Sequence, residues 1–490
     1  MISSMLFNSF VFIFAFLPIV FVGYYALNRY KNSNLAMLWL AAGSLFFYGY
    51  FVPKYLILLS ISILFNYGMG ELIRRTSNRK WKLLNLIIGL AFNIGLLGYY
   101  KYADFFITNF NAAFSTDYNL MHLILPLGLS FITFQKIAYL VDVYQGEETD
   151  YQFTHFALFA TFFPQLIAGP IVHHKEIIPQ FEDERNRHIQ WDNISKGIFI
   201  FVIGLAKKVV IADSVAVWAN DGYANVANLD FIGAWITSLS YTVQLYFDFS
   251  GYCDMAIGLA LLFNIRLPIN FNSPYKARNI QDFWKRWHMT LGRFLTQYIY
   301  IPLGGSKHGE WLTYLNTLIV FFISGFWHGA GWTFIIWGLM HGVGVVAVRV
   351  WKLTKIRLPY VVAWLLTFQF VNIGWVFFRS ASVEQAFTIL GKMFTPDWAS
   401  VPKYFKQAVP YLNEAATLEL FIGTMDNPYI IVASLVFLFA IALSMRNSLE
   451  RLDRFAFNWR SIFFIQVLVL LVLTSVFFMQ KNSVFLYFNF

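Results

Sequence analysis

Two histidines in apolar surroundings are the residues of this sequence best suited to acid–base chemistry. The stretch Trp311–Val348 contains no Asp, Glu, Lys or Arg, and its groups that titrate near neutral pH are His328 and His341. Glycines at 325, 329 and 331 bracket His328 and permit a turn or a close backbone approach. We expect a second helix to start near Gly331. The positive amino end of that helix would disfavour the imidazolium form of His328 and keep the ring neutral, as a general base requires. A buried structural histidine is the alternative.

Two further histidines have weaker signals. His341 lies about 20 Å from His328 along a continuous helix, so we expect the two rings not to share one substrate. His288 follows Trp284 and Trp287, which alternate with basic residues. This pattern is typical of an interfacial or re-entrant helix with Trp at headgroup level and Lys or Arg reaching toward water. The pattern by itself therefore favours a structural role for His288.

Two acids interrupt the apolar stretch 231–263. Asp248 and Asp254 are six residues apart, so on a helix they point about 120° apart and are not expected to form one carboxylate pair. Acids inside a membrane usually have a partner, and we expect each to take a hydrogen bond or an ion pair from a neighbouring helix.

Metal and redox chemistry lack support in the sequence. His173 and His174 are adjacent, so on a helix their side chains diverge by about 100°, and no supporting cluster of ligands surrounds them. Cys253 is the single cysteine of the chain. The signatures of zinc hydrolases, phosphate-binding loops, dinucleotide sites and serine-hydrolase elbows are absent. We expect no metal site.

The composition indicates a membrane protein. Of the 490 residues, 58% are hydrophobic and 13% charged, with a mean hydropathy of +0.56, whereas soluble domains average about 25% charged. At about 20 residues a span, the chain has material for roughly ten or more membrane helices. The sequence predicts an all-α integral membrane protein.

The basic residues predict how the spans are oriented. Cytoplasmic sides are assigned to the basic groups at 29–31, 74–82, 349–357 and 446–460, and both termini come out extracytoplasmic. Orientation accounts for much of the net charge of +10, so nucleic acid is not an expected partner. We expect one polytopic domain, with peripheral spans in 1–100, a core in about 118–348 and C-terminal spans in 358–490.

Two apolar segments in the core are broken by proline and glycine. The stretch 122–139 contains Pro126 and Gly128, and the stretch 154–172 contains Pro164, Gly169 and Pro170. Backbone groups that such breaks expose at membrane depth survive only inside protein or beside water. Tilted and re-entrant helices around a central tunnel are the expected result.

Several segments together resemble a known family. The sequence is similar to the membrane-bound O-acyltransferase family, and specifically to its bacterial branch of alginate and peptidoglycan O-acetylation proteins. The resemblance runs over most of the chain and rests on Tyr246–Gly258, Phe271–Tyr275, Phe283–Leu291, Tyr300–Gly305 and Gly325–Ala330, together with Pro126–Phe131, Pro164–Pro170, Lys207–Asp213 and Gly374–Arg379.

The resemblance implies a function and its residues. The family's catalytic histidine matches His328 and its second histidine matches His288, while Asp248 and Asp254 would support partners or shape the tunnel. It implies that acetyl-CoA, the cytosolic donor, never crosses the inner membrane. Only the acetyl group would pass, to an extracytoplasmic esterase-like transferase that acetylates a polysaccharide such as alginate or peptidoglycan. A water-poor site would limit hydrolysis of the thioester.

The carboxyl-terminal residues suggest an acyl relay. The segment Phe485–Phe490 resembles the ending shared by this branch and by the acyl-accepting peptide of the related D-alanylation system. By that resemblance Tyr487 would accept the acetyl group and pass it outward, because an aryl ester is more reactive than a sugar ester. An aromatic belt at the membrane surface is the alternative. A polysaccharide flippase, which also uses broken helices and intramembrane acids, is the competing function.

Overall fold

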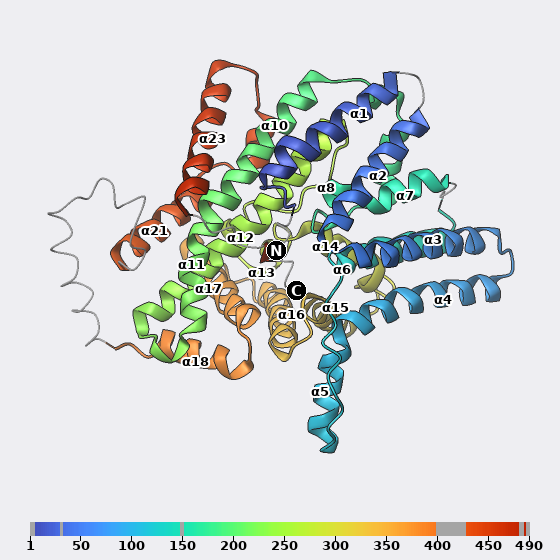
Figure 1. Ribbon diagram of the computed structural model, residues 1–490. Helices are drawn as coiled ribbons and strands as arrows, with labels where there is room; N and C mark the ends of the chain where they lie inside the picture. Colours follow the sequence, from blue (N-terminus) through green and yellow to red (C-terminus); the bar gives the residue numbers. More distant parts are fainter. Residues whose placement is uncertain (1–4, 30–32, 148–150, 398–427, 480–484, 487–490) are drawn as a thin grey trace. The chain divides into compact units, whose positions relative to one another are not determined.

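The computed structural model describes residues 5–29, 33–147, 151–397, 428–479 and 485–486. Throughout these ranges the regular structure is helical, without a strand (Figure 1). Eight helices within the described ranges are long and apolar enough to cross a membrane. The sequence prediction of an all-α, multi-span membrane protein is confirmed.

The first of two compact units comprises residues 1–201, 253–269 and 296–298. Helices α3 and α4 pack against each other and both pack against α6. From α4 the chain continues through a π-helical turn at Gly98–Tyr102 into α5, which departs from the direction of α4 (Figure 1). The helices that begin in this unit are α1 Leu17–Arg29, α2 Ser33–Phe51, α3 Pro53–Arg75, α4 Arg79–Leu97, α5 Ala103–Phe114, α6 Leu129–Gln145, α7 Phe153–Thr161, α8 Phe163–Leu166, α9 His174–Glu182 and α10 Trp191–Ala206.

The second unit comprises residues 202–252, 270–295 and 299–490. Its longest element, α12, has 32 residues and continues into the first unit after Tyr252. Every residue of α12 from Tyr241 onward is buried, as expected for a helix that is apolar all round. The helices of this unit are α11 Asp213–Ala224, α12 Phe231–Leu262, α13 Ile280–Trp284, α14 Met289–Leu295, α15 Glu310–His328, α16 Trp332–Leu353, α17 Tyr360–Arg379, α18 Val383–Phe394, α21 Pro428–Ser444, α22 Ser448–Asp453 and α23 Trp459–Met479.

The proline and glycine breaks predicted in the core are present in the first unit. Helix α6 starts only after Gly128, whose φ of +69° is a left-handed conformation that glycine adopts without strain, and a Cβ there would lie 2.8 Å from the carbonyl oxygen of Leu166. The stretch around Pro164 is divided into the short helices α7 and α8. Neither broken stretch forms one of the candidate spans within the described ranges.

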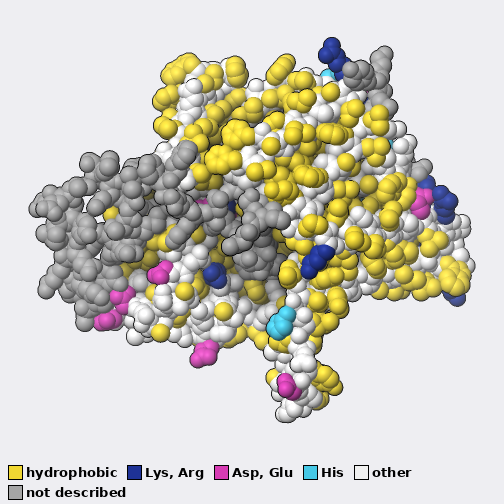
Figure 2. All heavy atoms as spheres, viewed as in Figure 1, with side chains coloured by type: hydrophobic (Ala, Val, Ile, Leu, Met, Phe, Trp, Pro, Cys, Tyr) yellow, Lys and Arg dark blue, Asp and Glu magenta, His cyan; other side chains and the backbone are white. Residues whose placement is uncertain are grey.

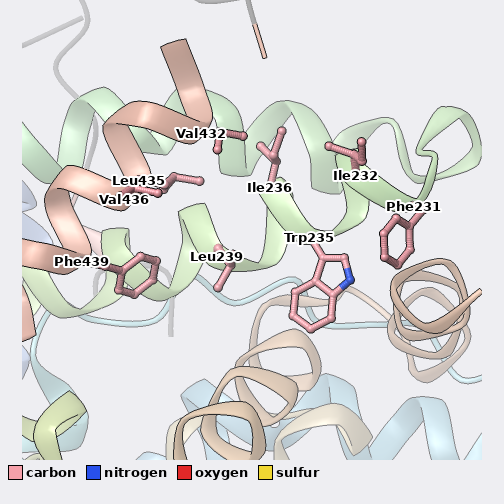
Figure 3. Close-up of a pocket in the computed structure, with 9 residues that line it drawn as sticks. All are labelled: Phe231, Ile232, Trp235, Ile236, Leu239, Val432, Leu435, Val436 and Phe439. Atoms are coloured by element: carbon pink, nitrogen blue, oxygen red, sulfur yellow. The ribbon is translucent and has the colours of Figure 1, made fainter. Parts of the chain in front are cut away.

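The surface matches a lipid environment. On the face drawn in Figure 2, hydrophobic side chains cover most of the described surface and charged side chains are few and separated. In the second unit, α12 and α21 form a groove of about 290 Å³ whose nine lining residues are all apolar, Trp235 and Phe439 among them (Figure 3). Water solvates such a groove poorly, so it suits contact with lipid or with another apolar surface.

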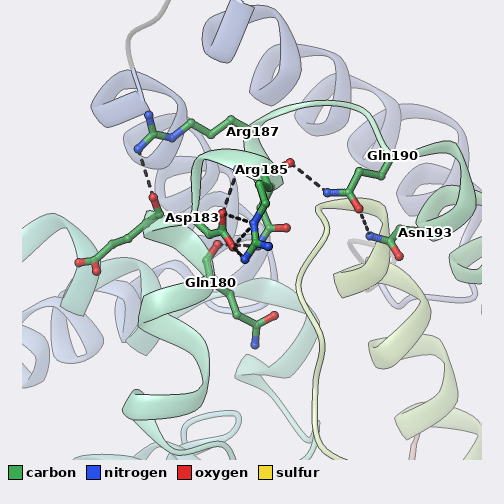
Figure 4. A network of polar contacts seen from close by, with 8 residues as sticks. Gln180, Asp183, Arg185, Arg187, Gln190 and Asn193 are labelled. Carbon is green, nitrogen blue, oxygen red and sulfur yellow. Dashed lines mark hydrogen bonds and ion pairs between the residues drawn. The ribbon is translucent and has the colours of Figure 1, made fainter.

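Charged residues gather in the connection between α9 and α10 of the first unit. Arg185 donates to both carboxylate oxygens of Asp183, at distances of 2.7–3.1 Å, and Gln190 donates to the backbone carbonyl of Arg185 (Figure 4). Asn193, near the start of α10, donates to Gln190. These contacts define a polar turn between helices rather than a span.

The pairing of α15 and α16 depends on glycines that face each other. A Cβ on Gly325 would meet the backbone carbonyl of Phe334 and would lie 3.0 Å from the Cα of Gly338. Gly329 and Gly331, between the two helices, have extended backbone with φ of −161° and −167°. The glycine cluster therefore permits the close approach of α15, which ends at His328, and α16.

We predict that Gly325→Ala destabilises the protein by about 1–3 kcal/mol, because the added methyl group overpacks the α15–α16 contact. Thermal unfolding in detergent, followed by size-exclusion chromatography, measures the effect. The control is Gly95→Ala on α4, where a Cβ would meet no atom within 4 Å. Equal stability of the two variants would contradict the close approach.

Candidate active site

His328 is buried among aromatic side chains of the second unit. It is 2% exposed, and its ring centroid lies 4.9 Å from Trp327, 5.0 Å from Trp337 and 5.3 Å from Phe378. These side chains come from the end of α15, the first turns of α16 and the end of α17. A reaction at this imidazole would proceed with little competing water.

The helix that contains His328 differs from the sequence expectation. Helix α16 does begin next to Gly331, as predicted, but His328 is the last residue of α15. The positive amino end of α16 and the negative carboxyl end of α15 therefore both lie next to His328. The carboxyl end of α15, where backbone carbonyls favour a cation, also acts on this ring.

His288 is brought beside His328, with 6.2 Å between the ring centroids. Its side chain is fully buried, and its backbone has a φ of +45° at the turn between α13 and α14. Trp287 is also buried, so the prediction that it lies at headgroup level on an interfacial helix is wrong, whereas the re-entrant alternative stays a prediction. The left-handed turn at His288 breaks the helix and directs both side chains into the protein.

The hydrogen bonds around Asn270 define the tautomer of His288. The Asn270 side-chain oxygen accepts from the backbone N–H and the hydroxyl of Thr290, so its orientation is fixed, and it lies 3.2 Å from Nδ1 of His288. An oxygen can only accept, so Nδ1 carries the proton and Nε2 carries the lone pair. Burial lowers the pKa of His288 to about 3, so this ring is neutral at physiological pH.

His341 is a structural neighbour of the site. Trp284 donates from its indole nitrogen to Nδ1 of His341 at 3.2 Å. Both His341 and His328 lie 5.0 Å from the indole of Trp337, so the expected separation of about 20 Å along one helix is wrong. The chain turns at 329–331, and the two helices fold back on each other.

Asp248 is part of a buried ion group. The ammonium of Lys208 lies 2.6 Å from Asp248 and 2.7 Å from Asp213, and all three side chains are buried. Burial alone would lower the pKa of Lys208, but the two carboxylates outweigh it and raise the pKa, so the lysine stays charged. We expected each of the two acids to have a partner on a neighbouring helix. For Asp248 of α12 this is confirmed, because Lys208 lies in the π-helical turn Lys207–Ala212. Asp254, also buried, belongs to the first unit.

The carboxyl-terminal segment reaches this part of the second unit. Phe485 is 2% exposed and stacks on Tyr252 with 4.4 Å between ring centroids. The backbone N–H of Leu486 donates to Asp248 Oδ2 at 2.9 Å. Tyr487, the predicted relay, follows directly in the sequence and lies outside the described residues.

The adjacent histidines of the first unit belong to a hydrogen-bonded network. His174 Nε2 lies 2.9 Å from Asp142, Tyr298 donates to the same carboxylate at 2.8 Å, and Tyr298 also lies 3.2 Å from His173. Burial would raise the pKa of Asp142, but the hydrogen bonds from His174 and Tyr298 outweigh it and lower the pKa. The described residues include no cluster of three or more metal-ligating side chains.

Three residues of the second unit's polar and aromatic clusters were not singled out from the sequence. Lys208 had a signal, because a lysine in an apolar stretch needs a counter-charge. Asn270 and Trp337 had none, since an isolated asparagine or tryptophan carries no local indication of a long-range contact. The fold alone brings them to His288 and His328.

These features define the class of the protein. Residues 144–384 match the membrane-bound O-acyltransferase family, and the chain belongs to that family. It is a membrane-bound acyltransferase.

Individual relatives cover most of the sequence. The chain is 47% identical to the peptidoglycan O-acetyltransferase of Helicobacter pylori, over 99% of this chain and 98% of that protein. It is 37% identical to the probable alginate O-acetylase AlgI of Pseudomonas aeruginosa, over 88% of this chain and 81% of that protein. A teichoic acid D-alanyltransferase of Bacillus subtilis is 26% identical, over 52% of this chain and 69% of its own length.

We predict that Lys208→Met destabilises the protein by about 3–5 kcal/mol, because it leaves two buried carboxylates without their cation. Unfolding in detergent measures the loss. Lys196→Met is the matched control, since Lys196 forms a largely exposed ion pair with Asp192, of the kind that contributes about 0–1 kcal/mol. A loss of similar size in both variants would show that the buried ion group has no special weight.

Proposed function

We propose that this protein transfers acetyl groups from cytosolic acetyl-CoA, across the cytoplasmic membrane, to an extracytoplasmic polysaccharide by way of a partner transferase. The observation that carries the proposal is the buried pair of His328 and His288, 6.2 Å apart between ring centroids. The full-length similarity to O-acetyltransferases supports it. The aromatic side chains around His328 suit an acyl group and exclude the water that would hydrolyse a thioester.

His328 acts as the general base in this proposal. It takes the proton from the attacking hydroxyl as the oxygen bonds to the thioester carbonyl carbon, and the carbon–sulfur bond then breaks. The imidazolium returns its proton to the departing thiolate of coenzyme A. His288, neutral and hydrogen-bonded to Asn270 through Nδ1, keeps its lone pair on Nε2 and helps to orient the reacting groups.

Tyr487 is the proposed first acceptor. Its phenol oxygen receives the acetyl group, and a hydroxyl of the partner transferase or of the polymer then attacks that ester. The phenolate leaves more readily than a sugar alkoxide, because a phenol has a pKa of about 10. The proposal is supported by the burial of Phe485 and by the bond from Leu486 to Asp248, immediately before Tyr487 in the sequence.

The acceptor polymer is proposed from the relatives. The peptidoglycan O-acetyltransferase of Helicobacter pylori matches nearly its full length at 47% identity, whereas the alginate O-acetylase of Pseudomonas aeruginosa matches at 37%. We therefore propose peptidoglycan as the polymer, with alginate or another exopolysaccharide as the alternative. Mass analysis of wall and capsule esters after deletion of the gene distinguishes them.

We predict that His328→Ala lowers polymer acetylation by about 100-fold or more, because a general base contributes a factor of roughly 10²–10⁴. The measurement is ester content per unit of polymer, with membrane insertion checked in parallel. The control is His308→Ala, at an exposed position of the loop before α15. An acyltransferase still exports unmodified polymer when His328 is replaced, whereas loss of export itself would favour a flippase. Normal acetylation would refute the assigned base.

We predict that Tyr487→Phe abolishes acetylation of the polymer, since it removes the acyl-accepting oxygen and keeps the aromatic ring. Tyr99→Phe, which removes a phenol oxygen from an exposed ring in the first unit, is the control and is expected to retain activity. Unchanged acetylation in Tyr487→Phe would eliminate the relay and leave direct transfer from the His328 site.

A further inference from the structure

The two oxygens of the Asp248 carboxylate have different partners. Oδ1 lies 2.6 Å from the ammonium of Lys208, and Oδ2 accepts the backbone N–H of Leu486 at 2.9 Å. The two residues of the second contact are 238 positions apart in the sequence. A backbone N–H inside a membrane protein must find an acceptor, and a charged acceptor makes a short and strong bond.

The charge balance of the ion group favours this contact. Lys208 lies within 2.7 Å of both Asp248 and Asp213, so one ammonium serves two buried carboxylates. The positive end of the Leu486 backbone N–H dipole lies against the second oxygen of Asp248, so Asp248 binds a peptide backbone as well as the ammonium of Lys208.

The residue before Leu486 is held by aromatic contacts. Phe485 stacks on Tyr252, with 24° between the ring planes, and lies 6.0 Å from Phe249. Phe249 in turn packs edge-on against His288 at 4.9 Å. Phe249 therefore contacts both Phe485 of the carboxyl-terminal segment and His288.

We propose that Asp248, held by Lys208 and Asp213, is a backbone clasp that seats the segment Phe485–Leu486 and thereby positions Tyr487 for the His328 site. Asp248 is then a positioning residue, which acts through Tyr487 rather than on the acyl group. The clasp binds the backbone N–H of Leu486 and the aromatic ring of Phe485. The side chain of residue 486 is therefore not recognised. This inference rests on the proposed acyl transfer through Tyr487.

The direct test removes the N–H and leaves the ion group intact. Leu486→Pro lacks the donor, and Leu486→Ala keeps it while shortening the side chain. We expect Leu486→Pro to have a kcat for acetyl transfer about tenfold or more below that of Leu486→Ala, the factor carried by one hydrogen bond to a charged group. The KM for acetyl-CoA is expected to be the same in both variants. If Tyr487→Phe is inactive, equal kcat values of the two Leu486 variants would overturn the clasp.

A second measurement reports the position of residue 487 independently of acetyl transfer. With p-benzoylphenylalanine at position 487, illumination of the purified full chain is expected to give an intramolecular cross-link to the α15 peptide that contains Trp327 and His328. The cross-link is expected to persist with Leu486→Ala and to be lost with Leu486→Pro and with Asp248→Asn. Neither substitution at position 486 changes the side chains of Lys208, Asp213 or Asp248. A loss of folding through the buried ion group is therefore controlled for. A cross-link that survives Leu486→Pro would overturn the proposal.

The outcomes separate this inference from the proposed relay. If Tyr487→Phe abolishes acetylation while Leu486→Pro and Leu486→Ala behave alike, the relay stands and the clasp is overturned. If the cross-link requires the Leu486 N–H but Tyr487→Phe remains fully active, Asp248 still binds the segment Phe485–Leu486, and the relay through Tyr487 is overturned.

Discussion

The scarcity of water and of compensating charge inside this protein is the constraint on which its architecture depends. An ion buried without a partner is costly, so Lys208 lies against both Asp213 and Asp248. The same constraint acts on backbone groups, and Asp248 also accepts the N–H of Leu486. A few polar contacts therefore connect parts of the second unit that are far apart in the sequence.

The reactive groups are placed by the same constraint. His288 is fully buried on a left-handed turn, which costs conformational energy, and Asn270 compensates by accepting from Nδ1 and from the backbone that follows. His328 is enclosed by Trp327, Trp337 and Phe378. The result is a pair of buried imidazoles among aromatic side chains, with 6.2 Å between their ring centroids.

Local sequence patterns predicted some of these features well. The glycines around His328 predicted that a second helix starts near Gly331, where α16 begins, and the prolines and glycines at 126–128 and 164–170 predicted the broken helices of the first unit. These features depend on hydropathy and backbone conformation over a few residues. The expected inside and outside assignments of the termini remain predictions, as does the division into peripheral and core spans.

Long-range contacts could not be predicted in the same way. The alternation of tryptophan and basic residues before His288 suggested an interfacial or re-entrant helix with tryptophan at headgroup level, because nothing local reveals the turn that buries Trp287 and His288. The separation of His328 from His341 was overestimated because the return of α16 along α15 depends on the facing glycines Gly325 and Gly338. The partner of Asp248 had a local hint in Lys208, but its bond to Leu486 had none.

The central claim is that His328 starts the transfer of an acetyl group onto the protein itself. Purified protein incubated with acetyl-CoA labelled in its acetyl group, followed by digestion and mass analysis of the peptide that contains residues 485–490, tests this most directly. The account predicts label on that peptide in the native protein and none in His328→Ala. Equal label in both proteins, or consumption of acetyl-CoA by the native protein without label on the peptide, would contradict it.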